Sequence, residues 1–376
     1  MCFFVAVFKF NIDINNIFLY YKYVRLLKKE VELMDGLIAV DGGGTKTEFI
    51  LTDTKGNVLS RSVYAGTNLN SVSYEDALLT LTRGTKDALG LAEQKGIDVR
   101  GAFFGLAGGV NGKNQSVIYN FFKPRFFPNT NFSNHGDELN AINVGVKNAP
   151  DGIVVIAGTG SNVSLKKDGK ILPNPHLSGW GYMFDNGGSG YDYGRDAIIA
   201  AKAHINGTGR PTMITEMLEE KLGCPVFDGL KQMYEGGPRF VSSLAVVPFD
   251  AYRKGDEVAT YLVEEQIANV ADLINNAHGV LGVETPALVG LVGGIFSHER
   301  TIIEPLLRAQ VNDNLTLDFP QENQIYGALM EAAKNADVEA DDEFLNNFNA
   351  TINQPLMQDD MRLLQSEYIQ SSCLEE

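Results

Sequence analysis

Cysteine is scarce in this sequence. The 376 residues include only Cys2, Cys224 and Cys373, which lie far apart, and no CxxC pair or cysteine–histidine cluster occurs. A disulfide framework, a zinc site and an iron–sulfur cluster are therefore unsupported. We expect the protein to be cytoplasmic.

Positive charge is also in short supply. Lys and Arg number 31 against 47 Asp and Glu, and the formal net charge is −16. A surface this acidic repels nucleic acid and anionic membranes, so neither is expected as a partner. An anionic ligand would need local help from backbone N–H groups, helix N-termini or a bound cation.

A long uninterrupted hydrophobic run is missing as well. Residues 1–33 are rich in Phe, Tyr and Ile, but Lys9, Asn11 and Asp13 interrupt them, whereas a membrane span needs roughly 20 mostly apolar residues. The segment also lacks the basic start and cleavage site of a secretory signal. Because Met34 precedes the first recognisable strand, we expect residues 1–33 to be an extension upstream of the natural start. An amphipathic appendage is the alternative.

Two domains are the expected organisation, because a chain of this length exceeds what one hydrophobic core usually organises. Apolar residues make up 44% and charged residues 21%, as in ordinary globular proteins. The 39 glycines gather in short runs, which favours tight turns at which the backbone approaches a ligand.

A pattern of strand, glycine turn, strand, turn and strand occurs twice. The first copy predicts strands over 36–41, 48–53 and 58–63, and helices follow each copy. Such a duplication indicates two α/β domains that face one another across a cleft. The second copy predicts strands over 152–157, 162–166 and 170–172; helices are expected over 74–91, 196–205, 211–222 and 256–281, and further strands over 101–107 and 287–292.

The turn that follows Asp41 has the composition of a phosphate-binding loop. Its glycines would let backbone N–H groups approach phosphate oxygens, and its side chains add donors. A dinucleotide fingerprint would open a helix, whereas residues 48–53 continue as a strand; a plain hairpin turn is the other alternative. A second glycine loop after residue 157 would face it. The candidate phosphate-binding residues are Gly43, Gly44, Thr45, Lys46, Thr47, Gly158, Thr159, Gly160 and Ser161.

Seven short segments, taken in order, carry the strongest signal. They are DGGGTKTE at 41–48, AGTNLN at 65–70, FGLAGG at 104–109, HGDELNA at 135–141, IAGTGSN at 156–162, SGWGYMFDNGGSGYDYGRDA at 178–197 and LVGGIF at 291–296. Together they resemble the BadF/BadG/BcrA/BcrD ATPase family, which includes N-acetylglucosamine kinases and belongs to the actin/hexokinase/Hsp70-type superfamily. The resemblance implies two duplicated ribonuclease H-like domains with the active site in the cleft between them.

The expected domain boundaries follow from this resemblance. Residues 34–136, joined by a helix near 323–336, would form the first domain, and residues 137–322 the second. Residues 337–376 would be an acidic tail, with a short helix before a poorly ordered end. We also expect a homodimer.

Two aspartates are candidates for the chemistry of phosphoryl transfer, which needs a cation across the phosphates and a carboxylate at the attacking hydroxyl. Asp41 is the candidate Mg²⁺ anchor, acting through water. The resemblance implies that Asp137 is the catalytic base. Its alternative role is the N-cap of a helix that begins at Glu138, and Glu138 is a weaker candidate base. The expected cofactors are ATP and Mg²⁺.

Several polar groups are candidates for binding a sugar. Asn68 matches a substrate-binding residue of the family, and Trp180, the only tryptophan, would be either a wall of the site or a core residue. One departure stands out: Asn186 and Gly187 replace the Asp and Glu that the family usually has, although Asp185 would serve if the alignment slides by one. Gly293 and Gly294 would lie on the adenosine side. The candidate substrate-binding residues are Thr67, Asn68, Gly108, Thr159, Gly179, Trp180, Asp185 and Asn186.

The resemblance implies an ATP-dependent kinase of an amino sugar, most simply N-acetylglucosamine or glucosamine. One alternative is an ATPase activator of an acyl-CoA dehydratase or reductase, but it needs paired cysteines for an iron–sulfur cluster, and Cys224 alone cannot supply them. The other is a non-catalytic sugar- or nucleotide-sensing protein on the same fold, which the change at Asn186 motivates.

Overall fold

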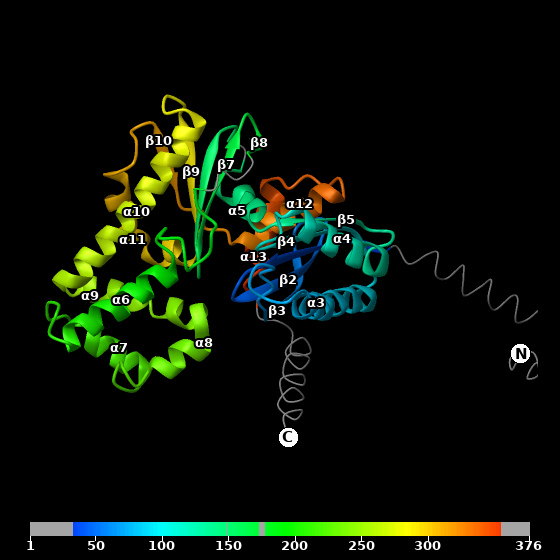
Figure 1. Ribbon diagram of the computed structural model, residues 1–376. Helices are drawn as coiled ribbons and strands as arrows, with labels where there is room; N and C mark the ends of the chain where they lie inside the picture. Colours follow the sequence, from blue (N-terminus) through cyan, green and yellow to red (C-terminus); the bar gives the residue numbers. More distant parts are fainter. Residues whose placement is uncertain (1–32, 148, 173–176, 355–376) are drawn as a thin grey trace, which may run out of the picture.

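A computed structural model of the protein describes residues 33–147, 149–172 and 177–354. Two five-stranded sheets with their helices form two lobes that lie side by side (Figure 1). Residues 1–32 of the predicted extension (1–33) and the end of the predicted tail, from residue 355, lie outside the described residues.

The two sheets have the same topology. The strand order is β3-β2-β1-β4-β5 in the first sheet and β8-β7-β6-β9-β10 in the second. In both sheets, therefore, the first strand in the chain lies in the middle, between the second and the fourth. In each sheet three successive strands pair antiparallel, and the last two extend the sheet in parallel. The predicted fold of two duplicated α/β domains is confirmed. The strands are β1 Met34–Gly42, β2 Lys46–Asp53, β3 Val58–Ala65, β4 Ile97–Leu106, β5 Asn131–Gly136, β6 Gly152–Ala157, β7 Ser161–Lys167, β8 Lys170–Ile171, β9 Ala287–Val292 and β10 Leu315–Asp318.

Helices cover both faces of the sheets, and several of them begin at side-chain caps. In α3, for example, the Ser73 side chain accepts from the Asp76 N–H at the start and Gly96 ends the helix with φ 67°, as expected of caps. The helices are α3 Tyr74–Lys95, α4 Gly112–Phe126, α5 Glu138–Gly145, α6 Gly190–Ile205, α7 Ile214–Leu222, α8 Leu230–Ser243, α9 Val246–Arg253, α10 Glu257–Leu281, α11 Gly294–Arg308, α12 Gln324–Asn335 and α13 Asp342–Thr351.

Two helices cross between the lobes. α5 follows the last strand of the first sheet but packs against β6, β7 and β9 of the second. Conversely, α12 follows the second sheet and packs against β1 and β4 of the first, and the two helices contact each other. In Figure 1 they lie together between the lobes. The exchange places α5, which begins directly after Asp137, at the junction of the two sheets.

Several elements differ from the sequence prediction. α6 begins six residues earlier than predicted, at Gly190, because Ser189 and Asp192 form a capping box. α4, α8, α9, α11, β5 and β10 were not predicted. α8 was obscured because it contains Gly237 and Pro238; the chain kinks at Gly237 (φ 57°, ψ −154°) and the helix resumes at the proline, a residue favoured in a first turn.

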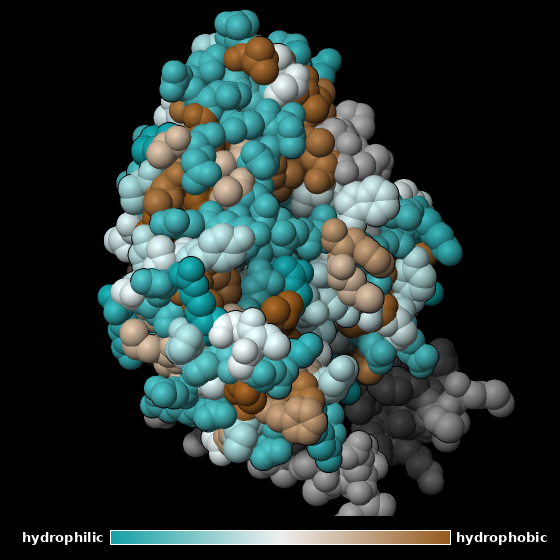
Figure 2. Space-filling view, turned by 60° about the vertical axis from the view of Figure 1, so that its left-hand side comes forward, coloured by the Kyte–Doolittle hydropathy of each residue, from teal (hydrophilic) through white to brown (hydrophobic). Residues whose placement is uncertain are grey.

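The segment after residue 336 is more than a tail. The short helix expected there is α13, whose Phe344 and Phe348 are buried in the core of the first lobe beside Tyr326. Over the described ranges, no helix is long and apolar enough to span a membrane. Figure 2 shows one face of the molecule, on which hydrophobic residues form separate patches among hydrophilic ones.

Candidate active site

Three parallel strands bring the predicted acidic residues together at one edge of the first sheet. Asp41 on β1 pairs with Gly105 on β4, which in turn pairs with His135 on β5. Parallel strands end at a common edge, where ligands usually bind in α/β folds. Asp137, two residues beyond His135, is therefore close enough to Asp41 for the two charges to interact.

Burial changes the acidity of both aspartates. It raises the pKa of Asp41 from 3.8 to about 6, and a 2.7 Å hydrogen bond from Asn140 Nδ2 opposes that rise. Burial also raises the pKa of Asp137 from 3.8 to about 8, and the negative charges of Glu138 and Asp41 add to the effect. Asp137 is the N-cap residue of α5, as the alternative predicted, but its side chain makes no capping hydrogen bond, so the cap position does not exclude a role as base. A buried carboxyl with a raised pKa can take up a proton near neutral pH.

The first glycine loop connects β1 to β2 in a tight turn. The Gly43 N–H donates to the Lys46 carbonyl at 2.9 Å, and the Thr67 N–H donates to the Gly43 carbonyl at 3.0 Å. One part of the prediction is corrected: Thr47 is fully buried and its hydroxyl donates to the Ala65 carbonyl, so its side chain supports the loop from behind and does not face a ligand.

The second glycine loop touches the first. Thr159 Oγ1 lies 2.8 Å from Thr45 Oγ1, a contact between turns that belong to different sheets. Behind it, the N–H groups of Gly190 and Tyr191 at the start of α6 donate to the carbonyls of Gly158 and Thr159. The two predicted phosphate loops therefore face each other across the junction of the lobes.

The glycine pair after β9 completes this edge of the second sheet. Gly293 has φ 114°, and a Cβ there would lie 2.4 Å from the Ala157 carbonyl oxygen. A side chain would fit neither the backbone conformation nor the space. Gly294 begins α11. The turn thus depends on glycine and lies against the end of β6, next to the second loop.

Basic groups near the first loop are already paired. Lys46 Nζ lies 2.8 Å from Glu48 Oε2, and Arg61 Nε lies 2.7 Å from Glu48 Oε1. His135 Nδ1 similarly lies 3.0 Å from Glu138 Oε1, and this acceptor raises the pKa of His135. The Lys46 side chain remains half exposed, so it can turn from Glu48 towards an anion.

The predicted sugar-binding residues of the first lobe have different surroundings. Asn68 Oδ1 accepts from the Asn70 N–H at 2.9 Å, and Gly108 has φ 72° with Asn70 packed against it. Thr67, in contrast, is fully buried and its hydroxyl bonds with that of Thr47 at 2.8 Å. The Thr67 side chain therefore joins the loop to the sheet, and the prediction that Thr67 binds substrate stays a prediction that only its backbone could meet.

The loop that contains Trp180 is held by its own aspartate. Asp185 Oδ2 accepts from the N–H groups of Gly179 at 3.1 Å and Gly181 at 2.9 Å. Burial raises the pKa of Asp185, and these bonds oppose the rise. Trp180 is 63% exposed, so the core alternative for the tryptophan is wrong. Phe184 is exposed with it, and the loop presents an apolar surface.

Two helices of its own lobe hold the Asn186 side chain in place. Its Oδ1 accepts from Arg195 Nη2 at 2.9 Å and from Gln266 Nε2 at 3.0 Å. Next to it, a Cβ on Gly187 would lie 2.5 Å from Ser161 Oγ. The segment therefore runs directly past the second glycine loop, and a larger residue at position 187 would need this packing to change.

A comparison with known families agrees with this geometry. Residues 38–332 match the BadF/BadG/BcrA/BcrD ATPase family. The chain belongs to this family. The match spans both sheets and reaches α12, so it includes every site segment described above. Membership of an ATPase family agrees with the ATP expected from the sequence.

Two curated proteins are similar to this BadF/BadG/BcrA/BcrD-type chain over most of their length. The N-acetyl-D-glucosamine kinase of Dictyostelium discoideum is 25% identical over 74% of this chain and 90% of its own. The N-acetylmuramic acid/N-acetylglucosamine kinase of Clostridium acetobutylicum is 26% identical over 70% of this chain and 87% of its own.

Solved structures of sugar kinases have a similar fold. A proposed N-acetylglucosamine kinase from Porphyromonas gingivalis aligns with a TM-score of 0.63 at 19% identity, covering 80% of this chain and 99% of its own. A ROK family glucokinase from Streptomyces griseus, in complex with glucose and AMPPNP, aligns with a TM-score of 0.54 at 19% identity, over 80% and 99% of the two chains.

A metal ion would have to be held by few protein groups. Within the described ranges, no three His, Cys, Asp or Glu side chains are placed together to hold one. Mg²⁺ fits such a site, because it keeps several waters and takes one or two carboxylates along with substrate phosphates. Asp41 would be a suitable donor, since it is buried and a cation would relieve the repulsion between its charge and that of Asp137.

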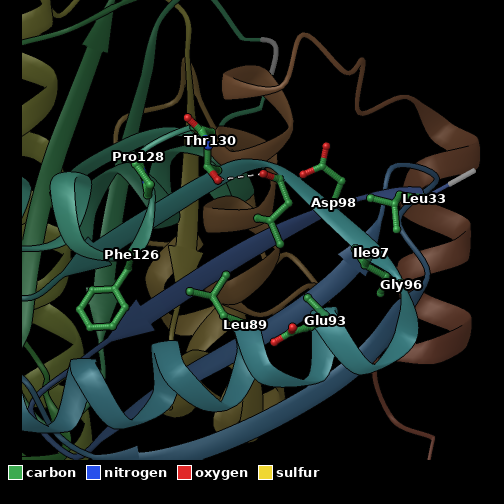
Figure 3. A pocket seen from close by; sticks show the side chains of 12 residues that line it. Leu33, Leu89, Glu93, Gly96, Ile97, Asp98, Phe126, Pro128 and Thr130 are labelled. Atoms are coloured by element: carbon green, nitrogen blue, oxygen red, sulfur yellow. Dashed lines mark hydrogen bonds between the residues drawn. The ribbon is translucent and has the colours of Figure 1, made fainter. Parts of the chain in front are cut away.

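One cavity lies away from this edge. It measures about 380 Å³ and includes Ile97, Asp98 and Val99 at the beginning of β4, whereas the site lies at the end of that strand. Figure 3 shows Leu89 of α3 and Phe126 of α4 beside it. The cavity and the candidate site are separated by nine residues of strand, roughly 30 Å. The cavity is therefore not part of the candidate active site.

The sequence prediction missed several residues of the site. Asn140 bonds to Asp41, Glu48 pairs with two cations, and Arg195 fixes Asn186. A signal for Asn140 was present, because it lies three residues after Asp137 and so shares its helix face. No local signal links Arg195 to Asn186, because that contact depends on how α6 packs.

Proposed function

We propose that the protein is an ATP-dependent sugar kinase that transfers the γ-phosphoryl group to a hydroxyl of an amino sugar, with N-acetylglucosamine as the leading substrate. The observation that supports this most directly is the meeting of two glycine loops, joined at Thr45 and Thr159, beside the buried pair Asp41 and Asp137. The curated relatives, named for N-acetylglucosamine and N-acetylmuramic acid, support the sugar class.

In the proposed mechanism the backbone N–H groups of both loops bind the phosphate chain, and the freed Lys46 ammonium adds charge. Asp41 would hold Mg²⁺ through water; when bound, the ion would neutralise charge across the phosphates. Asp137 accepts the proton of the sugar hydroxyl while the oxygen of that hydroxyl bonds to the γ-phosphorus. The bond from that phosphorus to the bridging oxygen breaks, and ADP leaves.

The sugar would lie between the first lobe and the loop of the second. We assign Asn68 and Gly108 to one side, and Trp180 and Asn186 to the other, with Thr159 between sugar and phosphate. The exposed indole supplies an apolar wall of the kind that sugar rings pack against. Gly293 and Gly294 would pack against the adenosine. A homodimer stays a prediction.

The test is an assay of ADP release over a panel of amino sugars, with Asp137→Asn and Glu138→Gln measured beside wild type. The proposal expects sugar-dependent turnover that Asp137→Asn lowers by roughly 10²- to 10⁴-fold, whereas Glu138→Gln retains most of it. Turnover that survives Asp137→Asn would show that another group is the base. Sugar binding without turnover on the whole panel would contradict the kinase.

A second candidate, a sugar- or nucleotide-sensing protein on the same fold, is favoured only by Asn186. Its amide stands where the family usually has an acid, and two donors already occupy its carbonyl oxygen. Asn186→Asp keeps an acceptor for both donors. If the amide is what limits turnover, this variant gains activity on a sugar that wild type only binds; if it gains none, the sensor loses its motivation.

A further inference from the structure

Asn140 links the two aspartates of the proposed site. It is fully buried on α5, and its Nδ2 donates to Asp41 Oδ1 on β1 at 2.7 Å, across 99 residues of sequence. Asp137 immediately precedes the same helix. A single hydrogen bond therefore fixes the helix that follows one carboxylate to the strand that carries the other.

Two glycines let neighbouring elements approach Asn140 closely. A Cβ on Gly105 of β4 would lie 2.1 Å from Asn140 Oδ1, and a Cβ on Gly327 of α12 would lie 1.9 Å from the Asn140 carbonyl oxygen. Gly105 thus makes space for the Asn140 side chain, and Gly327 for the backbone of the same residue. Its Oδ1 has no hydrogen-bond partner in the part of the chain that the structure describes. An unpaired buried acceptor destabilises a fold, so stability alone does not explain an asparagine here.

We propose that Asn140 is a positioning residue for the phosphoryl transfer: it orients the Asp41 carboxylate towards the Mg²⁺–nucleotide and sets its spacing from Asp137. The inference rests on the proposed function. The hydrogen bond occupies Oδ1 of Asp41 and leaves Oδ2 for a metal-bound water. Because Asn140 acts through Asp41, its loss affects binding of the metal–nucleotide complex and kcat, while the KM for the sugar changes little.

A matched control exists on the same helix. Asn143 donates from Nδ2 to the Gly327 carbonyl and to Glu331 Oε1, both at 3.1 Å. It is therefore also a hydrogen-bonded asparagine between α5 and α12, but it does not contact Asp41. Asn143→Ala should lower the melting temperature without changing the effect of Mg²⁺.

The experiment measures ADP binding by calorimetry with Mg²⁺ and with EDTA, together with melting temperatures and kinetics. For Asn140→Ala we expect the Mg²⁺-dependent gain in ADP affinity to fall about tenfold, while metal-free affinity stays within twofold of wild type. Should this variant not fold, Asn140→Leu keeps the volume and removes the donor. The double variant Asp41→Asn with Asn140→Asp restores a hydrogen bond between the positions, and we expect it to regain stability but not the Mg²⁺ effect.

The outcomes separate the two proposals. An unchanged Mg²⁺ effect in both Asn140 variants overturns the inference, and so does a wild type whose ADP affinity does not respond to Mg²⁺. A wild type with a normal Mg²⁺ effect that phosphorylates no sugar contradicts the kinase instead, and leaves the role of Asn140 to be decided by the binding data.

Discussion

Thr45 and Thr159 join the two glycine loops: their hydroxyl oxygens lie 2.8 Å apart, although the residues belong to different sheets. No phosphate chain fits between two groups at this distance. If the proposed function holds, this bond opens when the phosphates bind, and each hydroxyl can then donate to phosphate instead.

This exchange can be measured with a double-mutant cycle of Thr45→Ala and Thr159→Ala. Without nucleotide, the two changes should be coupled by about 0.5–1.5 kcal/mol in the free energy of unfolding, as for a neutral hydrogen bond. With saturating Mg²⁺–ADP, the coupling should disappear. Coupling that persists in the complex would show that the contact is structural.

Asp137→Asn should make the protein more stable at alkaline pH. The pKa of Asp137 is raised from 3.8 to about 8, so between these values the folded chain holds a proton that the unfolded chain has lost. Wild-type stability therefore falls as pH rises through this window, whereas Asn does not titrate. We expect the variant to melt at least ~3 °C higher at pH 8, with a smaller gain at pH 5. An equal gain in melting temperature at pH 5 and pH 8 would contradict a raised pKa for Asp137.

Glu138→Gln should change the pH dependence of turnover. The charge of Glu138 raises the pKa of Asp137, second only to burial. Without that charge the base ionises at lower pH, so kcat/KM at pH 6 should rise severalfold while the value at pH 9 stays the same. Glu331→Gln is the control, because Glu331 acts on His135. A pH profile that both variants leave unchanged would argue against Asp137 as the base.

Gly293→Ala should destabilise the second lobe. A φ of 114° disfavours any side chain, and the new Cβ would lie 2.4 Å from the Ala157 carbonyl oxygen. We expect a loss of about 2–4 kcal/mol, measured by denaturant unfolding. Gly112→Ala is the control, because Gly112 begins α4 and its Cβ would meet no atom within 4 Å; it should be neutral or slightly stabilising. Similar losses in both variants would contradict this account.

The sequence predicted the elements whose signals are local. The buried strands after Gly36 and Gly152 and the glycine turns that follow them were all identified, since an apolar run bounded by glycines is a local pattern. The resemblance to the family then assigned Asp137 to the same site as Asp41. Local patterns cannot predict which face of a sheet a later helix covers. For that reason the packing of α13 and the hydrogen bond from Arg195 to Asn186 were not predicted.

The same limit explains the errors at individual side chains. Thr47 and Thr67 belong to motifs that are rich in donors, but both are buried and bond to each other. Composition predicts that a loop can bind phosphate, whereas strand register decides which of its side chains point inward. Trp180 is the opposite case: it is a large apolar residue that lies exposed in a loop, outside the core.

The exchange of helices between the lobes also sets an order of events during synthesis on the ribosome. The face of the first sheet that contains Leu37, Ala39 and Phe103 is covered by α12 and α13, which emerge after the whole second lobe. At typical translation speeds the sheet would wait roughly 10–40 s with this face uncovered. The nascent chain therefore exposes this apolar face to aggregation during synthesis, and a stop codon before α12 would remove one side of the first lobe's core.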